Sequence, residues 1–151
     1  MRRSPEDQIF EFYRLSVEMA DRISARRGAA NAFFLTADSA LITAGGLILG
    51  AHLPVGRIGG SAIFAVGFLI NLVWWLQLVS YRQLSAAKWA VISRLEEKLP
   101  EQPFTLEWKY LKGYSSARTN KKYREIGQAE VFVPAIFMPV CLLVAALNLF
   151  V

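Results

Sequence analysis

Three long apolar runs divide the chain. They cover residues 29–53, 60–81 and 131–151. Each run is close to the roughly 20 residues that a helix needs to cross a ~30 Å hydrocarbon core. The runs are continuous and do not alternate between apolar and polar residues, so they indicate helices and not the strands of a barrel. The sequence therefore predicts an all-α membrane protein with three transmembrane helices in a single unit, residues 1–151.

The polar segments between the runs also have helical patterns. Near the start of residues 1–28 stands Ser4, a residue type that caps helices, and Pro5 after it fits a first turn. Apolar residues then recur at helical spacing. The sequence predicts that residues 1–28 form a cytosolic helix, with acidic residues in its first turn.

The second apolar run continues without a break into a longer polar segment, residues 82–130. Its first part is amphipathic up to Leu99, where Pro100 and Pro103 should end the helix. We expect a short helix at 104–112, a turn at 113–116 and another helix at 120–130. These elements predict a cytosolic helical extension packed beside the helix of residues 1–28.

Lysine and arginine are distributed unevenly. Six of the 17 precede the first run, one lies between the first two runs, and ten lie in residues 82–130. Cytoplasmic segments of membrane proteins carry an excess of these residues. The N-terminus and residues 82–130 are therefore expected in the cytosol, with the C-terminus outside. The net charge of +5 follows from this topology, and we expect no nucleic-acid partner.

Features of known catalytic sites are absent from the sequence. It has one histidine, His52, and one cysteine, Cys141, and it contains none of the phosphate-binding, zinc or nucleophile motifs. The prediction is a protein that is not an enzyme and has no cofactor and no metal site.

Polar residues inside the runs are the candidates for function. Asp38 lies in the first run, where an unpaired carboxylate is costly, so it should face other helices or water. Pairing the first two runs across a turn near residues 54–58 makes the numbers of facing residues sum to about 112. Asp38 then lies level with Trp74 and near Asn71 and Gln77. These three polar residues are predicted to line a pore or the bundle interior.

The same pairing places Arg82 level with Asn31, at the cytosolic boundary. If the third run starts at that depth, Glu130 lies there too, which predicts an Arg82–Glu130 ion pair. Two interpretations of these polar groups stay open at this point. One is a structural anchor, and the other is a role in gating or ion passage.

Small residues predict close helix contacts. Ser39, Thr43, Gly46 and Gly50 share one face of the first run, and Gly67 lies on a comparable stripe of the second. Small residues let helix backbones approach closely in membranes. The contacts could form within the chain or between copies, and we expect self-association. Pro134 and Pro139 are expected to kink the third run.

The polar segment after the second run resembles the corresponding segment of small bacterial membrane proteins of the RipA family, also described as octameric membrane proteins. The residues that carry the resemblance are Trp75, Tyr81, Arg82, Leu84, Lys88, Val91, Ile92, Leu95, Glu96, Leu99, Pro100, Pro103, Phe104, Glu107, Trp108, Tyr123, Glu130 and Pro134. Ser85 stands where asparagine is frequent. The architecture is also similar to that of SLATT proteins, which are proposed membrane-perturbing effectors in bacterial conflict. The resemblance implies a homo-oligomer, with an octamer as the expected form, and no catalytic residue.

Two functions from different classes follow. The first is an oligomeric inner-membrane assembly that forms or gates a pore or perturbs the membrane, as a defence or stress effector. The second is a non-catalytic scaffold in the lipid bilayer that recruits a cytosolic protein partner.

Overall fold

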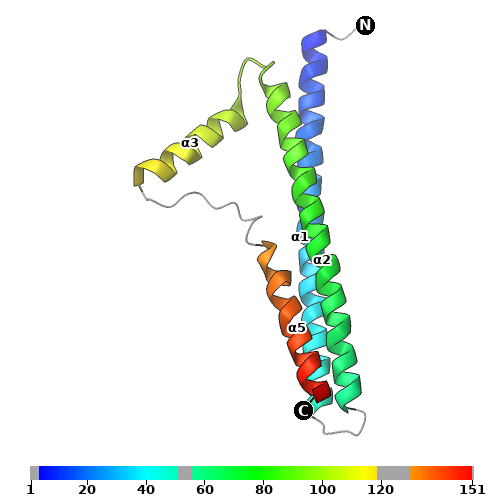
Figure 1. Cartoon of the computed structure of the whole chain (residues 1–151). Helices are drawn as coiled ribbons and strands as arrows, with labels where there is room; N and C mark the ends of the chain where they lie inside the picture. Colours follow the sequence, from blue (N-terminus) through cyan, green and yellow to red (C-terminus); the bar gives the residue numbers. More distant parts are fainter. Residues whose placement is uncertain (1–3, 51–55, 119–129, 151) are drawn as a thin grey trace. The chain divides into compact units, whose positions relative to one another are not determined.

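The computed structural model describes residues 4–50, 56–118 and 130–150, and these residues contain helices and no strand. The helices are α1 (Pro5–Gly50), α2 (Gly56–Glu96), α3 (Pro103–Arg118) and α5 (Phe132–Phe150), shown in Figure 1. The prediction of an all-α chain is confirmed for this part of the protein.

The start of α1 is capped as its sequence predicts. The backbone N–H of Asp7 donates to Ser4 Oγ at 3.1 Å, and the N–H of Ser4 donates to Asp7 Oδ2 at 3.2 Å. Such a reciprocal cap satisfies two donors that no helical carbonyl can reach. The helix then continues for 46 residues through Gly28. The predicted cytosolic helix of residues 1–28 and most of the first apolar run are therefore one element.

The second apolar run and the amphipathic segment after it also form one helix, α2, of 41 residues. It ends at Glu96, before Pro100, and α3 begins at Pro103. The predicted turn at 113–116 is wrong, because α3 continues through it to Arg118. A single glycine costs only about 1 kcal/mol in a helix interior, which the remaining turns of α3 tolerate. The helix predicted at 120–130 falls almost entirely outside the described residues.

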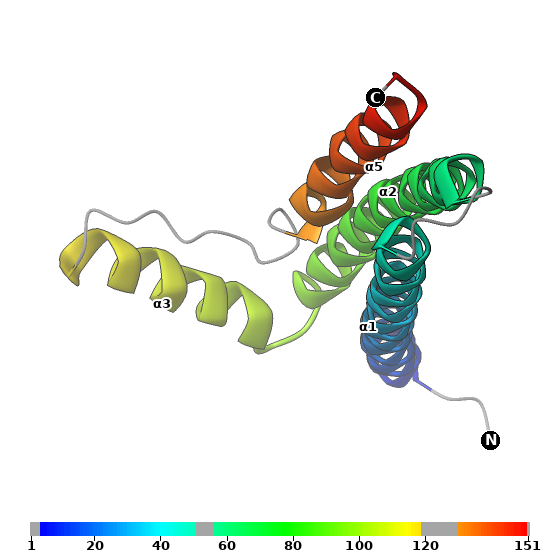
Figure 2. The same ribbon diagram turned by 90° about the horizontal axis from the view of Figure 1, so that it is seen from below.

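The contacts divide the chain into two units. The charged unit consists of Met1–Arg26 and Tyr81–Ile126, and the apolar unit consists of Arg27–Ser80 and Gly127–Val151. Both long helices contribute to both units. In the apolar unit, α5 lies beside α2, as Figures 1 and 2 show.

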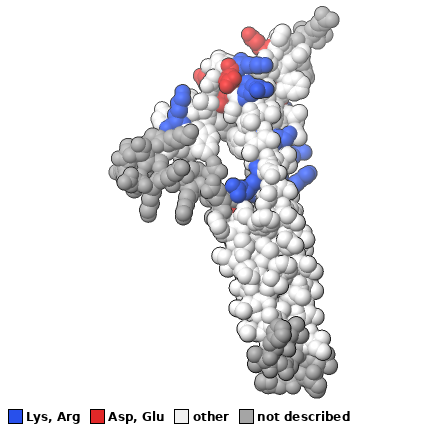
Figure 3. Space-filling model, viewed as in Figure 1, with Lys and Arg blue, Asp and Glu red and all other residues white. Residues whose placement is uncertain are grey.

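Two helices, Pro5–Gly50 and Ile58–Glu96, are long and apolar enough to cross a membrane, and Phe132–Asn148 is a shorter apolar helix. In each of the two long helices, the most apolar stretch of 18 residues is largely uncovered: only 17% and 28% of these stretches are buried within the protomer. The core helix of a soluble protein would be mostly covered, so these surfaces need lipid or another protein against them. In Figure 3 the residues of the lower parts of these helices that are not drawn in grey show no charged side chain on the visible face.

The core of the apolar unit is aromatic. The rings of Phe34 and Trp74 stack with their centroids 5.6 Å apart and their planes 8° apart, and Leu78 completes the cluster. Val131 and Val133 pack against it from the segment that begins α5. Aromatic pairs of this kind contribute about 0.5–1.5 kcal/mol beyond the area they bury. This cluster joins all three helices of the unit.

The two prolines of α5 occupy different positions. Pro134 lies in the first turn, where its missing N–H removes no helical hydrogen bond. Pro139 lies inside the helix, where a proline removes one hydrogen bond to the preceding turn. Of the two prolines, only Pro139 therefore stands where it can cause the kink predicted for the third run.

Candidate functional site

A polar pair is buried in the middle of the apolar unit. The side-chain amide of Asn71 on α2 donates to Oδ1 of Asp38 on α1 and to the carbonyl of Gly67, both at 2.9 Å. Asp38 is 4% exposed and Asn71 is 0% exposed. Two acceptors, Asp38 Oδ2 and Asn71 Oδ1, have no hydrogen-bond partner among the described residues. The structure thus places both residues in the interior of the protomer's own bundle.

The third helix closes over this pair. Cys141 on α5 faces Gly67, where a Cβ atom would lie 3.3 Å from the Cys141 sulfur and 4.0 Å from a methyl group of Leu41. Gly67 is one turn from Asn71 and accepts its hydrogen bond. Its missing side chain therefore lets α1, α2 and α5 meet beside the polar pair.

A second polar contact joins α1 to α2 one to two turns away. The indole N–H of Trp74 donates to Asn31 Oδ1 at 3.0 Å. This bond satisfies the only polar group of a buried tryptophan. It also orients the ring that stacks on Phe34. Gln77 is half-buried and forms no bond with the Asp38–Asn71 pair, since the bonds of that pair go to each other and to Gly67.

The contacts also give the register of the two long helices. The numbers of paired residues sum to 109 for Asp38 and Asn71 and to 105 for Asn31 and Trp74, whereas the prediction used 112. The difference corresponds to one or two helical turns along α1 at ~3.6 residues a turn. The sequence therefore placed Asp38 close to Asn71 but brought Gln77 too near.

The predicted Arg82–Glu130 ion pair stays a prediction, because the two residues belong to different units. Within the apolar unit, Glu130 Oε2 lies 3.4 Å from Nε of Arg27 on α1. Both side chains are about one quarter exposed. A pair that is partly exposed contributes about 0–1 kcal/mol, so it marks the end of the apolar unit more than it stabilises it.

The small residues predicted to mediate helix packing fall into two groups. We call Ser39, Thr43, Gly46 and Gly50 the small face of α1; all four are exposed in the protomer. A Cβ atom on Gly46 or Gly50 would meet nothing within 4 Å in the described part of the chain. By contrast, a Cβ on Gly45 would lie 2.9 Å from the ring of Phe64. Packing inside the protomer uses Gly45 and Gly67 and leaves the small face free.

The hydroxyl groups on the small face are already satisfied. Ser39 and Thr43 each donate to the carbonyl four residues earlier on α1, at 2.8 Å. Hydroxyls bonded in this way add no unsatisfied donor to an apolar surface. The small face is therefore compatible with close packing against another helix.

Glu96 is a buried carboxylate, although charged residues, Glu97 and Lys98, follow it in the sequence. It is 0% exposed. Its Oε1 accepts from the backbone N–H of Phe104 at 2.8 Å, and its Oε2 accepts from Thr105 N–H at 3.2 Å and from the Thr105 hydroxyl at 2.8 Å. The last residue of α2 thus caps the first turn of α3, where free N–H groups favour a negative charge.

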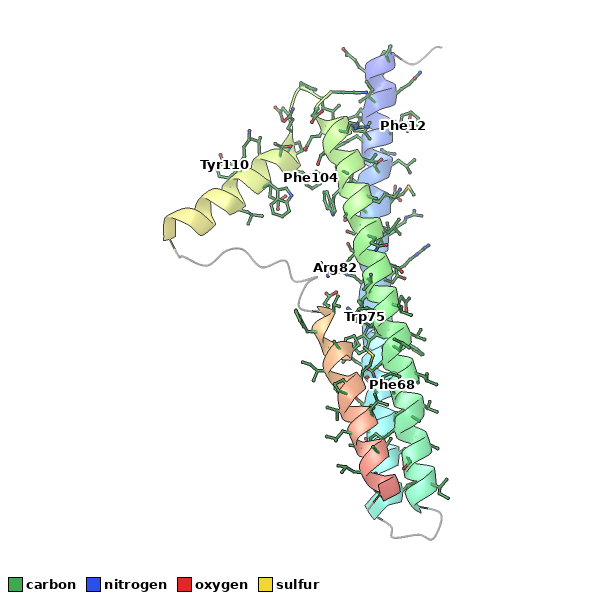
Figure 4. The ribbon with its side chains drawn as sticks, viewed as in Figure 1. Phe12, Phe68, Trp75, Arg82, Phe104 and Tyr110 are labelled. Carbon is green, nitrogen blue, oxygen red and sulfur yellow. The ribbon has the colours of Figure 1, made fainter. Side chains whose placement is uncertain are left out.

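Aromatic contacts surround this cap. The ring of Phe104 lies 5.0 Å from that of Trp89 and 6.4 Å from that of Tyr13, and Figure 4 shows Phe104 on the first turn of α3. These contacts bring α1, α2 and α3 together in the charged unit. One signal in the sequence could have revealed Glu96: it follows buried Ile92 by four residues, on the same face of the helix.

Tyr13 provides a titratable contact with the cap. Its hydroxyl donates to Glu96 Oε1 at 3.4 Å. Burial raises the pKa of the Tyr13 phenol, and the neighbouring Glu96 charge and the hydrogen bond to it act in the same direction. The neutral phenol is the form that donates, so its contribution to stability is present below about pH 10 and is lost as the pH rises through the raised pKa.

We expect this shift to be visible in a spectroscopic titration. The difference in phenolate absorbance between the wild type and Tyr13→Phe should rise only above about pH 10, the ordinary value for tyrosine. A difference curve centred at or below that pH would show that the hydroxyl does not contact Glu96 in solution.

The described residues bring together no three His, Cys, Asp or Glu side chains that could hold a metal ion. The buried polar groups join helices and include no nucleophile paired with a base. Their chemistry is hydrogen bonding between helices, with one carboxyl group in an apolar layer and one at a helix terminus.

The comparisons with known proteins agree with the membrane character of the chain. The family model described as the octameric membrane protein family (8xMP) matches residues 10–150, which is nearly the whole chain. The search of curated proteins and the search of solved structures gave no match.

Proposed function

Because the chain belongs to the octameric membrane protein family, we propose that it assembles as a homo-oligomer, an octamer, in the bacterial inner membrane and forms or gates a pore there. The membership itself establishes an oligomeric membrane protein. The proposal adds the number of copies, the identity of the membrane, the topology and the pore.

The observation that carries the proposal is the uncovered small face of α1. Its four residues are exposed in the protomer although they lie in one of the two helices that could cross a membrane. Lipid tails gain nothing from small residues, whereas a second helix can approach them closely. We infer that the small face contacts another copy of the chain.

In the proposed topology, α1, α2 and α5 each cross the membrane. The 19 residues of α5 span roughly 28 Å at ~1.5 Å per residue, close to the thickness of a hydrocarbon core. The N-terminus and the segment after residue 81 are cytosolic, because 16 of the 17 lysines and arginines lie there. The C-terminus is then on the outer side.

The polar residues have separate roles in this proposal. Asp38 and Asn71 hold α1 against α2 inside each protomer, so a change in their contact alters the packing of the bundle. Gln77 is half-buried and is the one predicted pore candidate outside this pair. Arg82 and Glu130 border the cytosolic side. The pore then opens when protomers move relative to one another along the small face. As in an effector, a cytosolic trigger acts through the charged unit.

Purified protein in detergent and in liposomes tests the proposal. Native mass measurement is expected to give a single oligomer of about eight chains. Liposomes that contain the wild type should release an entrapped dye, and Thr43→Leu should reduce both the release and the oligomer. Ala44→Leu is the matched control, since Ala44 is exposed on a different side of α1. A monomer at micromolar concentration, or an intact oligomer without leakage under any trigger, contradicts the pore.

The alternative is a scaffold that recruits a cytosolic protein, and α3 favours it. Leu106, Trp108 and Tyr110 are 48%, 42% and 77% exposed on this helix, and Tyr110 is labelled in Figure 4. Aromatic residues of this kind are enriched in protein interfaces. An intact oligomer that never leaks, together with a partner whose binding Tyr110→Ala abolishes, would support the scaffold.

A further inference from the structure

Asp38 and Asn71 share one hydrogen bond, and each of them also has one buried oxygen without a hydrogen-bond partner among the described residues. Asn71 Nδ2 donates to Asp38 Oδ1, while Asp38 Oδ2 and Asn71 Oδ1 are buried acceptors without a donor. A carboxyl group and a primary amide can form two parallel hydrogen bonds when the acid carries its proton. When Asp38 is ionised, Asp38 Oδ2 and Asn71 Oδ1 are both hydrogen-bond acceptors, so neither can donate to the other.

Within the described part of the apolar unit, no charge lies close enough to stabilise an ionised Asp38. Among the residues with described side chains at 28–50, 58–80 and 131–148, it is the only one of a charged type. Arg27, the described cation of the apolar unit, precedes Asp38 by eleven residues on the same helix, roughly 16 Å at ~1.5 Å per residue. An isolated ionised carboxylate in an apolar environment is costly, and such groups become neutral instead.

We propose that Asp38 and Asn71 form a proton-binding site in the apolar unit, in which the Asp38 carboxyl group carries a proton and donates it in a hydrogen bond to Asn71. One proton satisfies both unpartnered oxygens, with Asp38 Oδ2 as donor and Asn71 Oδ1 as acceptor. It also removes the only charge that the described side chains place in this layer of the bundle. The inference concerns each protomer and does not depend on the proposed pore.

A metal cation fits the site less well. Ca²⁺ and Mg²⁺ take about six or more oxygen ligands. The pair offers two unpartnered oxygens, and no cluster of three candidate ligands exists among the described residues. A bound cation would also leave Asp38 ionised, and this difference separates the two occupants in an experiment.

The site predicts proton-dependent packing of the three helices. Asn71 faces Asp38 from α2, and the Cys141 thiol is the titratable group on α5 that faces the same contact. Neither is charged at neutral pH. Loss of the proton would therefore place an unpaired charge where α1, α2 and α5 meet, and should loosen the bundle.

Infrared difference spectroscopy of the oligomer in lipid tests the proposal directly. At neutral pH the wild type should show the C=O stretching band of a protonated carboxyl group, shifted in deuterated water. Asp38→Asn should abolish the band. Asn71→Leu should keep it and move it to a higher frequency, because the hydrogen bond to the amide is lost.

Thermal unfolding provides the second test. Asp38→Asn should leave the unfolding midpoint close to that of the wild type, since an amide can form the same two hydrogen bonds as a neutral acid. Asp38→Leu should lower the midpoint, because it removes the acceptor of Asn71. The absence of the band at neutral pH, or an Asp38→Asn variant that is as unstable as Asp38→Leu or fails to fold, would overturn the proposal. A midpoint that rises with sodium, calcium or magnesium in the wild type but not in Asp38→Asn would identify a cation instead.

Discussion

Glu96→Ala is expected to release the first turn of α3 and to lower the free energy of unfolding by about 2–4 kcal/mol. The backbone N–H groups of Phe104 and Thr105 both lose their acceptor, and so does the Thr105 hydroxyl. Each buried donor left unsatisfied costs about 1–3 kcal/mol, and removal of the buried carboxylate offsets part of this cost. Gln102, the residue before α3, accepts a hydrogen bond from Leu106 N–H through its backbone carbonyl.

Hydrogen exchange provides the measurement. Amides of residues 104–111 should lose protection in Glu96→Ala, with an intermediate loss in Glu96→Gln, which keeps one acceptor oxygen. Glu97→Ala is the matched control, because Glu97 is the next residue and is exposed. Equal protection and equal stability in Glu96→Ala and Glu97→Ala would show that the carboxylate does not hold α3.

Gly67→Leu should destabilise the folded protomer, whereas Gly46→Leu should leave the protomer folded and weaken its assembly. A leucine at position 67 must displace the Cys141 sulfur, which lies 3.3 Å from its Cβ position. Overpacking of this kind costs typically about 1–3 kcal/mol, so α5 should separate from α2 and the unfolding midpoint should fall. A leucine at position 46 meets open space in the protomer and replaces a glycine in a helix, which favours folding by up to about 1 kcal/mol.

Assembly distinguishes the two variants. We expect Gly46→Leu to remain folded and helical while its mass in detergent falls below that of the wild-type oligomer, because the small face can no longer approach a second helix. Circular dichroism and native mass measurement give both quantities from one sample. If Gly46→Leu assembles as the wild type does, the copies meet through another surface.

Local features of the chain were predictable because they depend on neighbours in sequence. The Ser4 cap, the end of α2 before Pro100 and the start of α3 at Pro103 follow from backbone chemistry within a few residues. Long apolar runs likewise indicate helices whatever lies beside them. The error at residues 113–116 has the same origin, since glycine and serine favour a turn but only weakly oppose a helix.

Contacts between helices were predicted less well. The Asp38–Asn71 contact was within reach of a simple pairing rule, whereas the contact between Arg27 and Glu130 was not. The number of residues between α1 and α2 sets the register, and an error of a few residues in this number moves every later contact by one turn. The role of Glu96 was not predicted, because its neighbours in sequence are charged, whereas its neighbours in space are the N–H groups of α3.

The sequence by itself determined that this chain is helical, where its apolar layers lie, and that one carboxyl group is embedded in them. Only the tertiary structure decided which small residues are covered and which stay free. Gly45 packs against Phe64, while Gly46, its neighbour, faces open space. Adjacent residues on a helix point about 100° apart at ~3.6 residues a turn. The rotation of α1 about its own axis therefore separates the face that builds the protomer from the face left for another copy.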